Sequence, residues 1–320
     1  MSDVHESNTD NAIAIEAWNT VLFEKFCRFR YVLTDGLSVH SDELFRRKPF
    51  PAGARVLDIG CGFGDTAQRI ARHVTPGGEA VGIDCAQGFI DIAIREAREA
   101  SVKNAAFLVA DAQSDNLLGP YDYVFSRFGT MFFNLPGRAM RNIRRALLPG
   151  GELAMVVWRR REDNLWLYEA EQRVKQIVPI VRHEDSDQVH CGPGPFSMAN
   201  ADTVSDLLRD AGYDRIALER FDADICIGRT LDDAVAFALE IGPAGEIIRL
   251  AGEAGEKCRG QAIAALRETF AGYERADGIW APSSTWLTMP SASLGSNQVD
   301  FGGMMPPASA TAIRSAIWVG

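Results

Sequence analysis

The stretch Val56-Leu57-Asp58-Ile59-Gly60-Cys61-Gly62-Phe63-Gly64 decides the fold. Its first four residues predict a short buried strand, and glycine then stands at every second position. Residues 66–74 follow with apolar side chains at helical spacing. Glycines permit positive φ angles and let backbone N–H groups approach a ligand, and a helix N-terminus adds a weak positive field. The stretch therefore predicts a ligand-binding loop between a strand and a helix.

The alternation of strands and helices continues along the chain after this loop. The apolar patterns predict strands at 80–83, 106–110, 121–125 and 152–158 and helices at 88–100 and 137–147. Strands that alternate with helices of this length are joined by right-handed crossovers. The fold class is therefore α/β, with a doubly wound and mostly parallel sheet.

The flanks of this region predict the domain organisation. Residues 1–48 read as an N-terminal cover of one or two helices, and the main domain spans 49–290. Two helical insertions interrupt it, at 159–200 and at 231–274, the latter with two predicted helices. A helix at 202–211 ends at Gly212, and Thr230-x-x-Asp233 resembles a capping box that opens another helix. Residues 291–320 carry few charges, and we expect a tail that is disordered or packed on the body.

Composition excludes several classes of protein. The 320 residues include 33 basic and 43 acidic side chains, a net charge of −10 that disfavours nucleic acid as a partner. No apolar run reaches the roughly 18 residues of a membrane span, and the polar, acidic N-terminus lacks the pattern of a signal peptide. Six cysteines without metal-finger spacing favour a reducing cytoplasm.

The glycine spacing discriminates among ligands. A dinucleotide fingerprint has its third glycine three residues after the second, whereas here Asp65 stands at that position. The phosphate-cradling pattern with its lysine is absent too. Asp58, just ahead of the glycines, would repel a pyrophosphate. A nucleotide-dependent oxidoreductase therefore stays only as a disfavoured alternative.

Three carboxylates follow the first three strands of the sheet. Asp58 would attract an ammonium group, directly or through water. Asp84 ends the second strand, where a carboxylate can accept both hydroxyls of a ribose. Asp111 follows the third strand and could accept from an exocyclic amine. The carboxyl ends of parallel strands meet in one crevice. A ligand with an amino group, a ribose and an adenine but no phosphate fits all three, and S-adenosylmethionine is such a ligand.

At this point the sequence resembles the class I S-adenosylmethionine-dependent methyltransferases. The resemblance rests on VLDIGCGFG (56–64), GID (82–84), ADA (110–112) and LLPGGELAMVVW (147–158). FSRFGTMFF (125–133) and GPGPFSMANADTVSDLLRDAGY (192–213) resemble the ubiquinone/menaquinone-biosynthesis-type branch, whose members act on small molecules. The resemblance implies a Rossmann-like sheet of seven strands whose last strand, at 279–289, is antiparallel.

It also implies a set of site residues. The candidate contacts of the methyl donor are Asp58, Gly60, Gly62, Gly64, Asp84, Cys85, Asp111, Ala112 and Ser126. The candidate contacts of the methyl acceptor are Trp18, Arg127, Phe128 and Met131. The aromatic rings among them suit an apolar acceptor, and a ring face can also stabilise a sulfonium by cation–π attraction. Each aromatic has a plain alternative as a core residue, and Arg127 has one as an ion pair.

Acid–base candidates are scarce. His183 and His190 are weak candidates for a general base, and the polar segment around them matches no zinc spacing, so we expect no metal. His40 and His73 read as structural or exposed.

The leading interpretation is methyl transfer to O, N or C of a small, fairly apolar metabolite by in-line displacement. A non-catalytic or regulatory protein of the same fold is the alternative from another class. It would act through self-association, for instance as a homodimer that uses Ile241, Ile247, Ile248 and Leu250. Methylation of a protein stays open, and methylation of nucleic acid is disfavoured by the charge.

Overall fold

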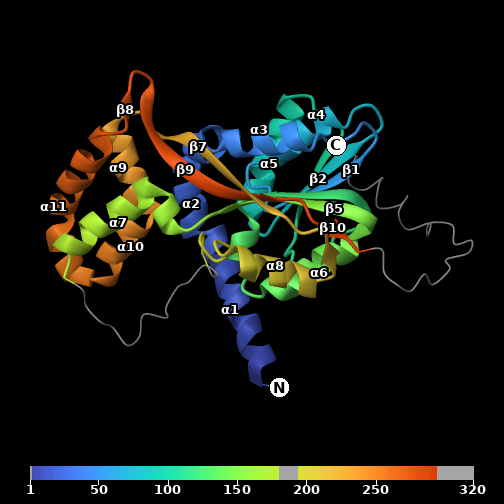
Figure 1. The fold of residues 1–320 in the computed structure, drawn as a ribbon, viewed down its shortest axis with the longest axis horizontal. Coiled ribbons are helices and arrows are strands. Elements are labelled where there is room, and N and C mark those ends of the chain that lie inside the picture. Colours follow the sequence, from blue (N-terminus) through green and yellow to red (C-terminus); the bar gives the residue numbers. More distant parts are fainter. Residues whose placement is uncertain (1, 180–193, 294–320) are drawn as a thin grey trace, which may run out of the picture.

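A twisted β-sheet forms the centre of the molecule, and the computed structural model describes residues 2–179 and 194–293 (Figure 1). Seven strands of five residues or more make up this sheet within the described residues. They are β1 (Arg55–Ile59), β2 (Glu79–Asp84), β3 (Ala105–Val109), β4 (Tyr121–Arg127), β5 (Leu147–Trp158), β7 (Leu218–Gly228) and β9 (Gly278–Thr288). Three two-residue strands are added: β6 (Tyr213–Asp214), β8 (Glu274–Arg275) and β10 (Ser291–Ala292).

The strand order confirms a doubly wound sheet. Strands β3, β2, β1, β4 and β5 are neighbours in that order and run parallel. Strand β9 then pairs antiparallel with β5, and β7 pairs antiparallel with β9. The order in which strands are added to the sheet reverses at β1, since β2 and β3 lie on one side of it and β4 and β5 on the other. Ligands of open α/β sheets bind at such a switch point. The predicted antiparallel last strand is β9.

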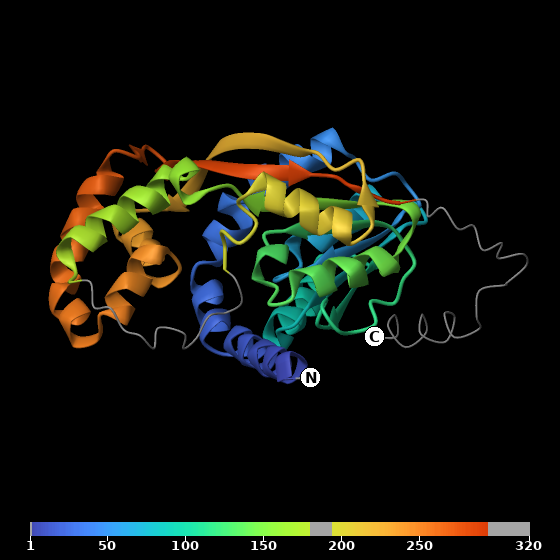
Figure 2. The same ribbon diagram turned by 60° about the horizontal axis from the view of Figure 1, so that its bottom comes forward.

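Helices cover both faces of the sheet. The face with α3 (Ser38–Arg47), α4 (Asp65–His73) and α5 (Gln87–Glu99) lies opposite the face with α6 (Pro136–Ala146) and α8 (Ala201–Asp210) (Figures 1 and 2). The side chain of Val56 packs with Phe45 and Ile70 on the first face, and that of its neighbour Leu57 packs with Met140 and Ile143 on the second. Because both faces are buried, β1 is apolar apart from Arg55 at its start and Asp58.

The N-terminal cover consists of more pieces than the one or two helices that the sequence predicts. It runs through α1 (Ser2–Asn19), α2 (Val21–Arg28), the π-helical turn η1 (Val32–Gly36) and α3. Helix α2 lies between the sheet and a separate group of helices (Figure 1). The Nζ of Lys25 donates to the carbonyl of Glu240 at 3.0 Å, and Phe29 meets Phe237 edge to face at 5.4 Å. The cover therefore joins the two parts of the molecule.

The second part is a helical lobe beside the far ends of β7 and β9. It contains α7 (Leu165–Ile177), α9 (Leu231–Glu240), α10 (Pro243–Leu250) and α11 (Gly252–Ala271), so the 231–274 insertion holds three helices where two were predicted. The predicted cap is present, since Thr230 Oγ1 accepts from the Asp233 N–H at 3.2 Å. Ile248 is fully buried in the lobe, and Ile241 and Ile247 pack against the same core. These three isoleucines therefore belong to the lobe's own core, whereas Leu250, the fourth residue considered for a dimer surface, is 37% exposed.

The C-terminal boundary differs slightly from the prediction. Ser291 and Ala292 form β10, which pairs with β5 and β6, so the sheet extends two residues into the segment read as a tail. The rest of that tail, from residue 294, lies outside the described residues. Among the residues that are described, none of the helices is both long and apolar enough to cross a membrane.

Candidate functional site

The glycine loop sits between β1 and α4, at the carboxyl end of the strand. Gly60 and Gly62 have φ angles of +65° and +51°, in the left-handed region that favours glycine. A Cβ atom at Gly60 would lie 3.0 Å from the Cα of Gly129, so the loop is packed against the end of β4. A Cβ atom at Gly62 would meet nothing within 4 Å. The loop is therefore closely packed at Gly60 and open at Gly62, where a ligand has room.

Asp84 connects the end of β2 to this loop. Its Oδ2 accepts from the Gly62 N–H at 3.0 Å, and its Oδ1 accepts from the Ala86 N–H at 3.0 Å. Burial raises the pKa of this carboxyl, and the two backbone N–H groups oppose that rise. Each oxygen has a second lone pair, so the carboxylate can accept two further hydrogen bonds. A pair of ribose hydroxyls needs that capacity.

Asp58 is a buried carboxyl with an incomplete set of partners. Its Oδ2 accepts from the Thr66 hydroxyl at 2.5 Å, and its Oδ1 has no hydrogen-bond partner among the described residues. Burial is the main reason that its pKa rises to about 7, and the nearby carboxylate of Asp65 adds to the effect. A buried acceptor without a partner is uncommon, and an ordered water or an ammonium group would satisfy it.

Asp111 lies just beyond the end of β3 and has more partners than the sequence predicts. It accepts from the Gln113 N–H at 2.9 Å, the Ser114 hydroxyl at 2.7 Å and the side-chain amide of Asn11 at 2.8 Å. Asn11 belongs to α1, a hundred residues earlier in the chain. Sequence reasoning missed Asn11 and Gln113, although ADAQS places Gln113 two residues after the predicted carboxylate.

Three further donor-site candidates lie at or just beyond the ends of β4, β2 and β3. Ser126 is buried and donates its hydroxyl to the Ile59 carbonyl at 2.8 Å, which fixes β4 beneath the glycine loop. Burial raises the pKa of the Cys85 thiol well above its usual range, so the thiol is neutral. The Cys85 carbonyl accepts from Asn19 of α1 at 3.3 Å. Ala112 is buried.

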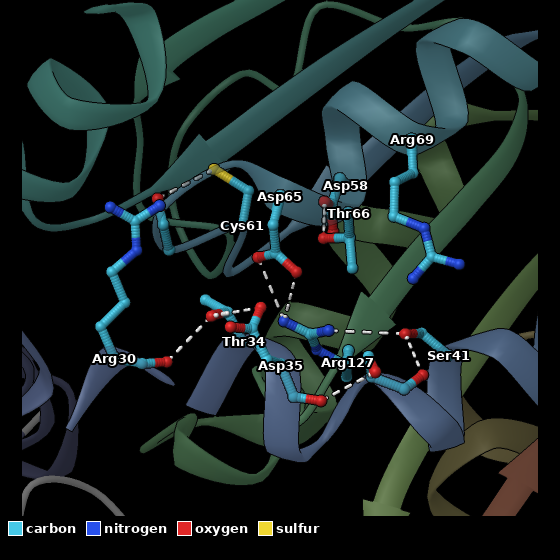
Figure 3. A network of polar contacts seen from close by, with 12 residues as sticks. Arg30, Thr34, Asp35, Ser41, Asp58, Cys61, Asp65, Thr66, Arg69 and Arg127 are labelled. Atoms are coloured by element: carbon cyan, nitrogen blue, oxygen red, sulfur yellow. Dashed lines mark hydrogen bonds and ion pairs between the residues drawn. The ribbon is translucent and has the colours of Figure 1, made fainter. Parts of the chain in front are cut away.

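Arg127 ends β4 and forms an ion pair in front of the glycine loop (Figure 3). Its Nη2 lies 2.9 Å from Oδ2 of Asp65, and its side chain is only 9% exposed. Its Nη1 donates to the Ser41 hydroxyl of α3 at 3.4 Å. The guanidinium thus joins the first turn of α4 to the N-terminal cover. The predicted acceptor contact Arg127 is held by an acidic partner in this structure.

An aromatic wall follows Arg127. Phe128 has a φ angle of +58°, unusual for a bulky residue, and its ring stacks on Trp158 at 4.3 Å between centroids. Met131 is buried, and its sulfur accepts from the Trp158 N–H at 3.4 Å. Trp18 of α1 meets Phe132 edge to face at 5.1 Å. The ends of β4 and β5 and the first helix therefore share one apolar boundary.

His40 of α3 stands behind this wall and was not predicted as part of it. Its ring meets Phe128 and Trp158 edge to face, each at 5.8 Å. Its two nitrogens lie 2.9 Å from Ser283 Oγ and 3.1 Å from Thr285 Oγ1, both on β9. Burial and the charge of Arg127 lower its pKa to about 3, so the ring is neutral. Only the pairing of α3 with a strand some 240 residues later reveals this contact.

The weak base candidates His183 and His190 lie outside the described residues. Within the described ranges 2–179 and 194–293, no group of three or more His, Cys, Asp or Glu side chains is arranged to hold a metal ion.

Comparison with known proteins identifies the family. Residues 56–151 match the family model of a methyltransferase domain. The ubiquinone/menaquinone biosynthesis C-methyltransferase UbiE of Pseudomonas aeruginosa is 26% identical over 174 residues, which cover 52% of this chain and 67% of that protein. The demethylmenaquinone methyltransferase of Listeria welshimeri is 30% identical over 110 residues, which cover 32% of this chain and 44% of that one. The chain is a class I S-adenosylmethionine-dependent methyltransferase.

Solved structures support the fold of this methyltransferase. The YcgJ protein of Bacillus subtilis superposes with a TM-score of 0.54 at 18% identity and covers 81% of this chain and all of its own. Phosphoethanolamine N-methyltransferase 2 of Haemonchus contortus, solved with S-adenosylmethionine, gives a TM-score of 0.54 at 16% identity, covering 88% of this chain and 60% of its own. Neither an oxidoreductase nor a non-catalytic role gains support from these matches.

S-adenosylmethionine is the methyl donor of this class, and the crevice fits it. The space above Gly62 has no side chain in it, and Asp58 has an oxygen without a partner. Asp84 ends β2 and Asp111 follows β3 beside that space, and Arg127, whose charge acts on Asp58, is paired with Asp65. The residues present suit a cationic ligand without phosphate.

Proposed function

We propose that this methyltransferase binds S-adenosylmethionine at the carboxyl ends of β1, β2 and β3. The observation that carries the proposal is the succession of Asp58, Asp84 and Asp111 around the open face of Gly62. In this arrangement Asp84 takes the ribose hydroxyls, and Asp111 takes the exocyclic amine of the adenine. The negative potential around Asp58 holds the ammonium of the methionine part, directly or through water.

The acceptor site lies at the ends of β4 and β5, against Phe128, Met131 and Trp158. We infer a small and fairly apolar acceptor, methylated at O, N or C, because the described side chains of this wall are rings and thioethers. The bound donor supplies an electrophilic methyl group. The chain's own residues align the acceptor with that methyl group and exclude water. Trp18 of α1 closes the wall from the side of the cover.

The Arg127–Asp65 pair serves as a positioning element in this proposal. Because both partners are largely enclosed, the pair fixes α3 over the first turn of α4 and keeps the cover seated (Figure 3). An acidic acceptor would have to compete with Asp65 for the guanidinium. A neutral acceptor is therefore favoured over a carboxylate.

Location and assembly follow from weaker signals. We propose a reducing compartment such as the cytoplasm, since the five cysteines among the described residues are all free thiols. A homodimer stays a proposal in which, of the four residues considered, only Leu250 is exposed, because the three isoleucines pack within the lobe.

Calorimetry with S-adenosylhomocysteine, the demethylated product, tests the proposed donor site. We expect saturable binding of one molecule per chain by the wild-type protein and no binding of NADH. Heat with NADH but none with S-adenosylhomocysteine would overturn the proposal. Light scattering at several protein concentrations tests the homodimer separately.

A further inference from the structure

A buried glutamine, Gln113, joins the carboxylate of Asp111 to two distant parts of the chain. Its side chain is only 6% exposed. Its Oε1 accepts from the backbone N–H of Leu135 at 2.7 Å. Because a backbone N–H can only donate, this bond fixes which end of the amide is oxygen. The Nε2 of Gln113 must therefore point the other way, toward Asp111 and α1.

The orientation of Gln113 in turn fixes that of Asn11. The Nε2 of Gln113 donates to Oδ1 of Asn11 at 2.5 Å. The Nδ2 of Asn11 is then the end that donates to Oδ2 of Asp111, at 2.8 Å. The carboxamide of Asn11 thus offers one donor and one adjacent acceptor. Asp111 accepts the hydrogen bond from the Asn11 donor, and Gln113 donates a hydrogen bond to the Asn11 acceptor.

This is the pattern that adenine presents on its Watson–Crick edge. The exocyclic N6 amine is a donor, and the ring nitrogen N1 beside it is an acceptor. A carboxamide has the same donor and acceptor at a similar spacing. Hypoxanthine reverses the pattern, since its O6 accepts and its N1 carries a hydrogen. The pair formed by Asp111 and Gln113 is therefore complementary to adenine and not to hypoxanthine.

Asp111 has no spare capacity while Asn11 is in place. Its Oδ2 accepts from both Asn11 and the Ser114 hydroxyl, which uses the two lone pairs of that oxygen. Its Oδ1 accepts from the Gln113 N–H at 2.9 Å and lies 3.3 Å from Gln113 Nε2. An adenine amine can reach Asp111 only if Asn11 gives up its place.

Helix α1 has a second attachment to the crevice at its C-terminal end, independent of Asn11. Asn19, two turns later, accepts from the Gln87 N–H at 3.0 Å and donates to the Cys85 carbonyl. Ala14 is buried between these positions, whereas Ile13 on the opposite side is 51% exposed. One face of the helix therefore lies on the crevice, with an anchor at its C-terminal end and Asn11 over the end of β3.

We propose that Asp111 and Gln113 read the N6 and N1 positions of the donor's adenine, and that Asn11 occupies this pair as an adenine mimic until the donor displaces it. The inference rests on the proposed donor site. It adds Gln113 as a specificity-determining residue and makes α1 a competitor of the donor.

Calorimetry on the full chain separates the two roles, with S-adenosylhomocysteine and its inosine counterpart as probes. Asn11→Ala removes the competitor, so S-adenosylhomocysteine should bind about 3- to 10-fold more tightly, the range expected for one or two net hydrogen bonds. Gln113→Ala removes the N1 donor. It should weaken that binding about 5-fold and reduce the preference for adenine over hypoxanthine. The matched control Ile13→Ala changes the exposed side of the same helix and should leave both affinities as in wild type.

Each contrary outcome has a distinct meaning. Weaker binding by Asn11→Ala would make Asn11 a direct ligand contact and overturn the mimic. An unchanged preference for adenine in Gln113→Ala, and in Gln113→Met, which keeps the length of the side chain, would overturn the reading role. Thermal unfolding checks that each variant is folded. If wild type fails to bind S-adenosylhomocysteine at all, the proposed donor site fails first.

Discussion

Buried polar groups at the carboxyl ends of β1–β3 differ from those at residues 283–285 of β9, where His40 and Asn164 pack. At the donor side, Asp58 has an oxygen without a partner, and Asp84 retains lone pairs. At β9, both nitrogens of His40 meet hydroxyls. Asn164 beside them exchanges hydrogen bonds with the backbone of Ser284 at 2.9 and 3.2 Å. Polar capacity is left open in the first region and satisfied in the second.

This contrast separates binding from structure in the same sheet. Buried polar groups are normally hydrogen-bonded, and His40, Asn164 and the side chains of residues 283–285 follow the rule. Its titratable group is held neutral, because burial lowers the pKa of His40 to about 3. On the donor side, Oδ1 of Asp58 departs from the rule, and the two oxygens of Asp84 keep lone pairs for a ligand. We therefore expect substitutions on the donor side to change ligand affinity and substitutions near β9 to change stability.

The largest expected effect is that of Asp84→Ala on donor binding. The substitution removes two ribose contacts and the acceptor that holds the Gly62 and Ala86 N–H groups. At about 1.5 kcal/mol or more for each charge-assisted bond, S-adenosylhomocysteine should bind on the order of 100-fold more weakly in calorimetry. Asp91→Ala, on the exposed side of α5, is the matched control and should stay close to wild type. Equal affinities for the two variants would remove Asp84 from the site.

A second comparison lies within the glycine loop. An alanine at Gly60 would need a left-handed backbone and would press against Gly129, so Gly60→Ala should lower the free energy of unfolding by about 2–4 kcal/mol. Gly62→Ala has the backbone strain without the clash and should cost about 1–2 kcal/mol. The added methyl group of Gly62→Ala occupies the open space at this position, so the substitution should also weaken the binding of S-adenosylhomocysteine. Denaturant unfolding and calorimetry together test the pair. A more stable Gly60→Ala than Gly62→Ala would contradict the described packing.

The parallel half of the molecule could be predicted from the sequence because its signals are local. The strand, the glycines and the helix of the loop occupy one continuous stretch, and each carboxylate directly follows its strand. Gly212 and Thr230 also predicted helix boundaries from local sequence alone. The structure has a φ of +88° at Gly212 and a capping hydrogen bond at Thr230.

The parts that the sequence did not predict depend on contacts across long separations. His40 meets Ser283 and Thr285 only because β9 lies beside β5 and α3 crosses them. Asn11 meets Asp111 only because α1 folds back over the crevice. The separate helix α10 was not predicted for another reason. Gly242-Pro243 indicates by itself only the end of the preceding helix, whereas the proline is also the first residue of α10.

Opposite pH dependences should distinguish the two regions. The folded pKa of His40, about 3, lies below its ordinary 6.5, so its contribution to stability is present above pH 6.5 and is lost as pH falls. The folded pKa of Asp58, about 7, lies above its ordinary 3.8, so its contribution is present below about pH 4 and is lost as pH rises toward 7. In the wild-type protein, the contributions of His40 and Asp58 to the free energy of unfolding therefore change with pH in opposite directions.

Single substitutions should reveal the pH dependence of the free energy of unfolding that each group contributes. Asp58→Asn leaves the effect of His40, so relative to wild type its free energy of unfolding should fall more steeply as pH drops from 6.5 to 4. His40→Gln leaves the effect of Asp58, so relative to wild type its stability should fall as pH rises from 4 to 7. Each difference amounts to at most about 1.4 kcal/mol per pH unit. Denaturant unfolding across this range tests both. Parallel curves for all three proteins would refute the assignment.

The smallest expected effect lies in the helical lobe. Thr230→Ala removes the hydroxyl that caps α9 and should lower the free energy of unfolding by about 1 kcal/mol. Because α9 packs within the lobe and away from the glycine loop, affinity for S-adenosylhomocysteine should stay the same. Thr203→Ala on α8, where Asn200 provides the cap, is a control that should have little effect on stability. A loss of donor affinity in Thr230→Ala would show that the lobe and the donor site are coupled.

A crystal structure with S-adenosylhomocysteine tests the central claim most directly. We expect the ligand at the carboxyl ends of β1–β3, with its ribose hydroxyls on Asp84, its adenine amine on Asp111 and its chain above Gly62. The carboxamide of Asn11 should have left Asp111. Density for the ligand anywhere else, with Asn11 still bonded to Asp111, would contradict this proposal.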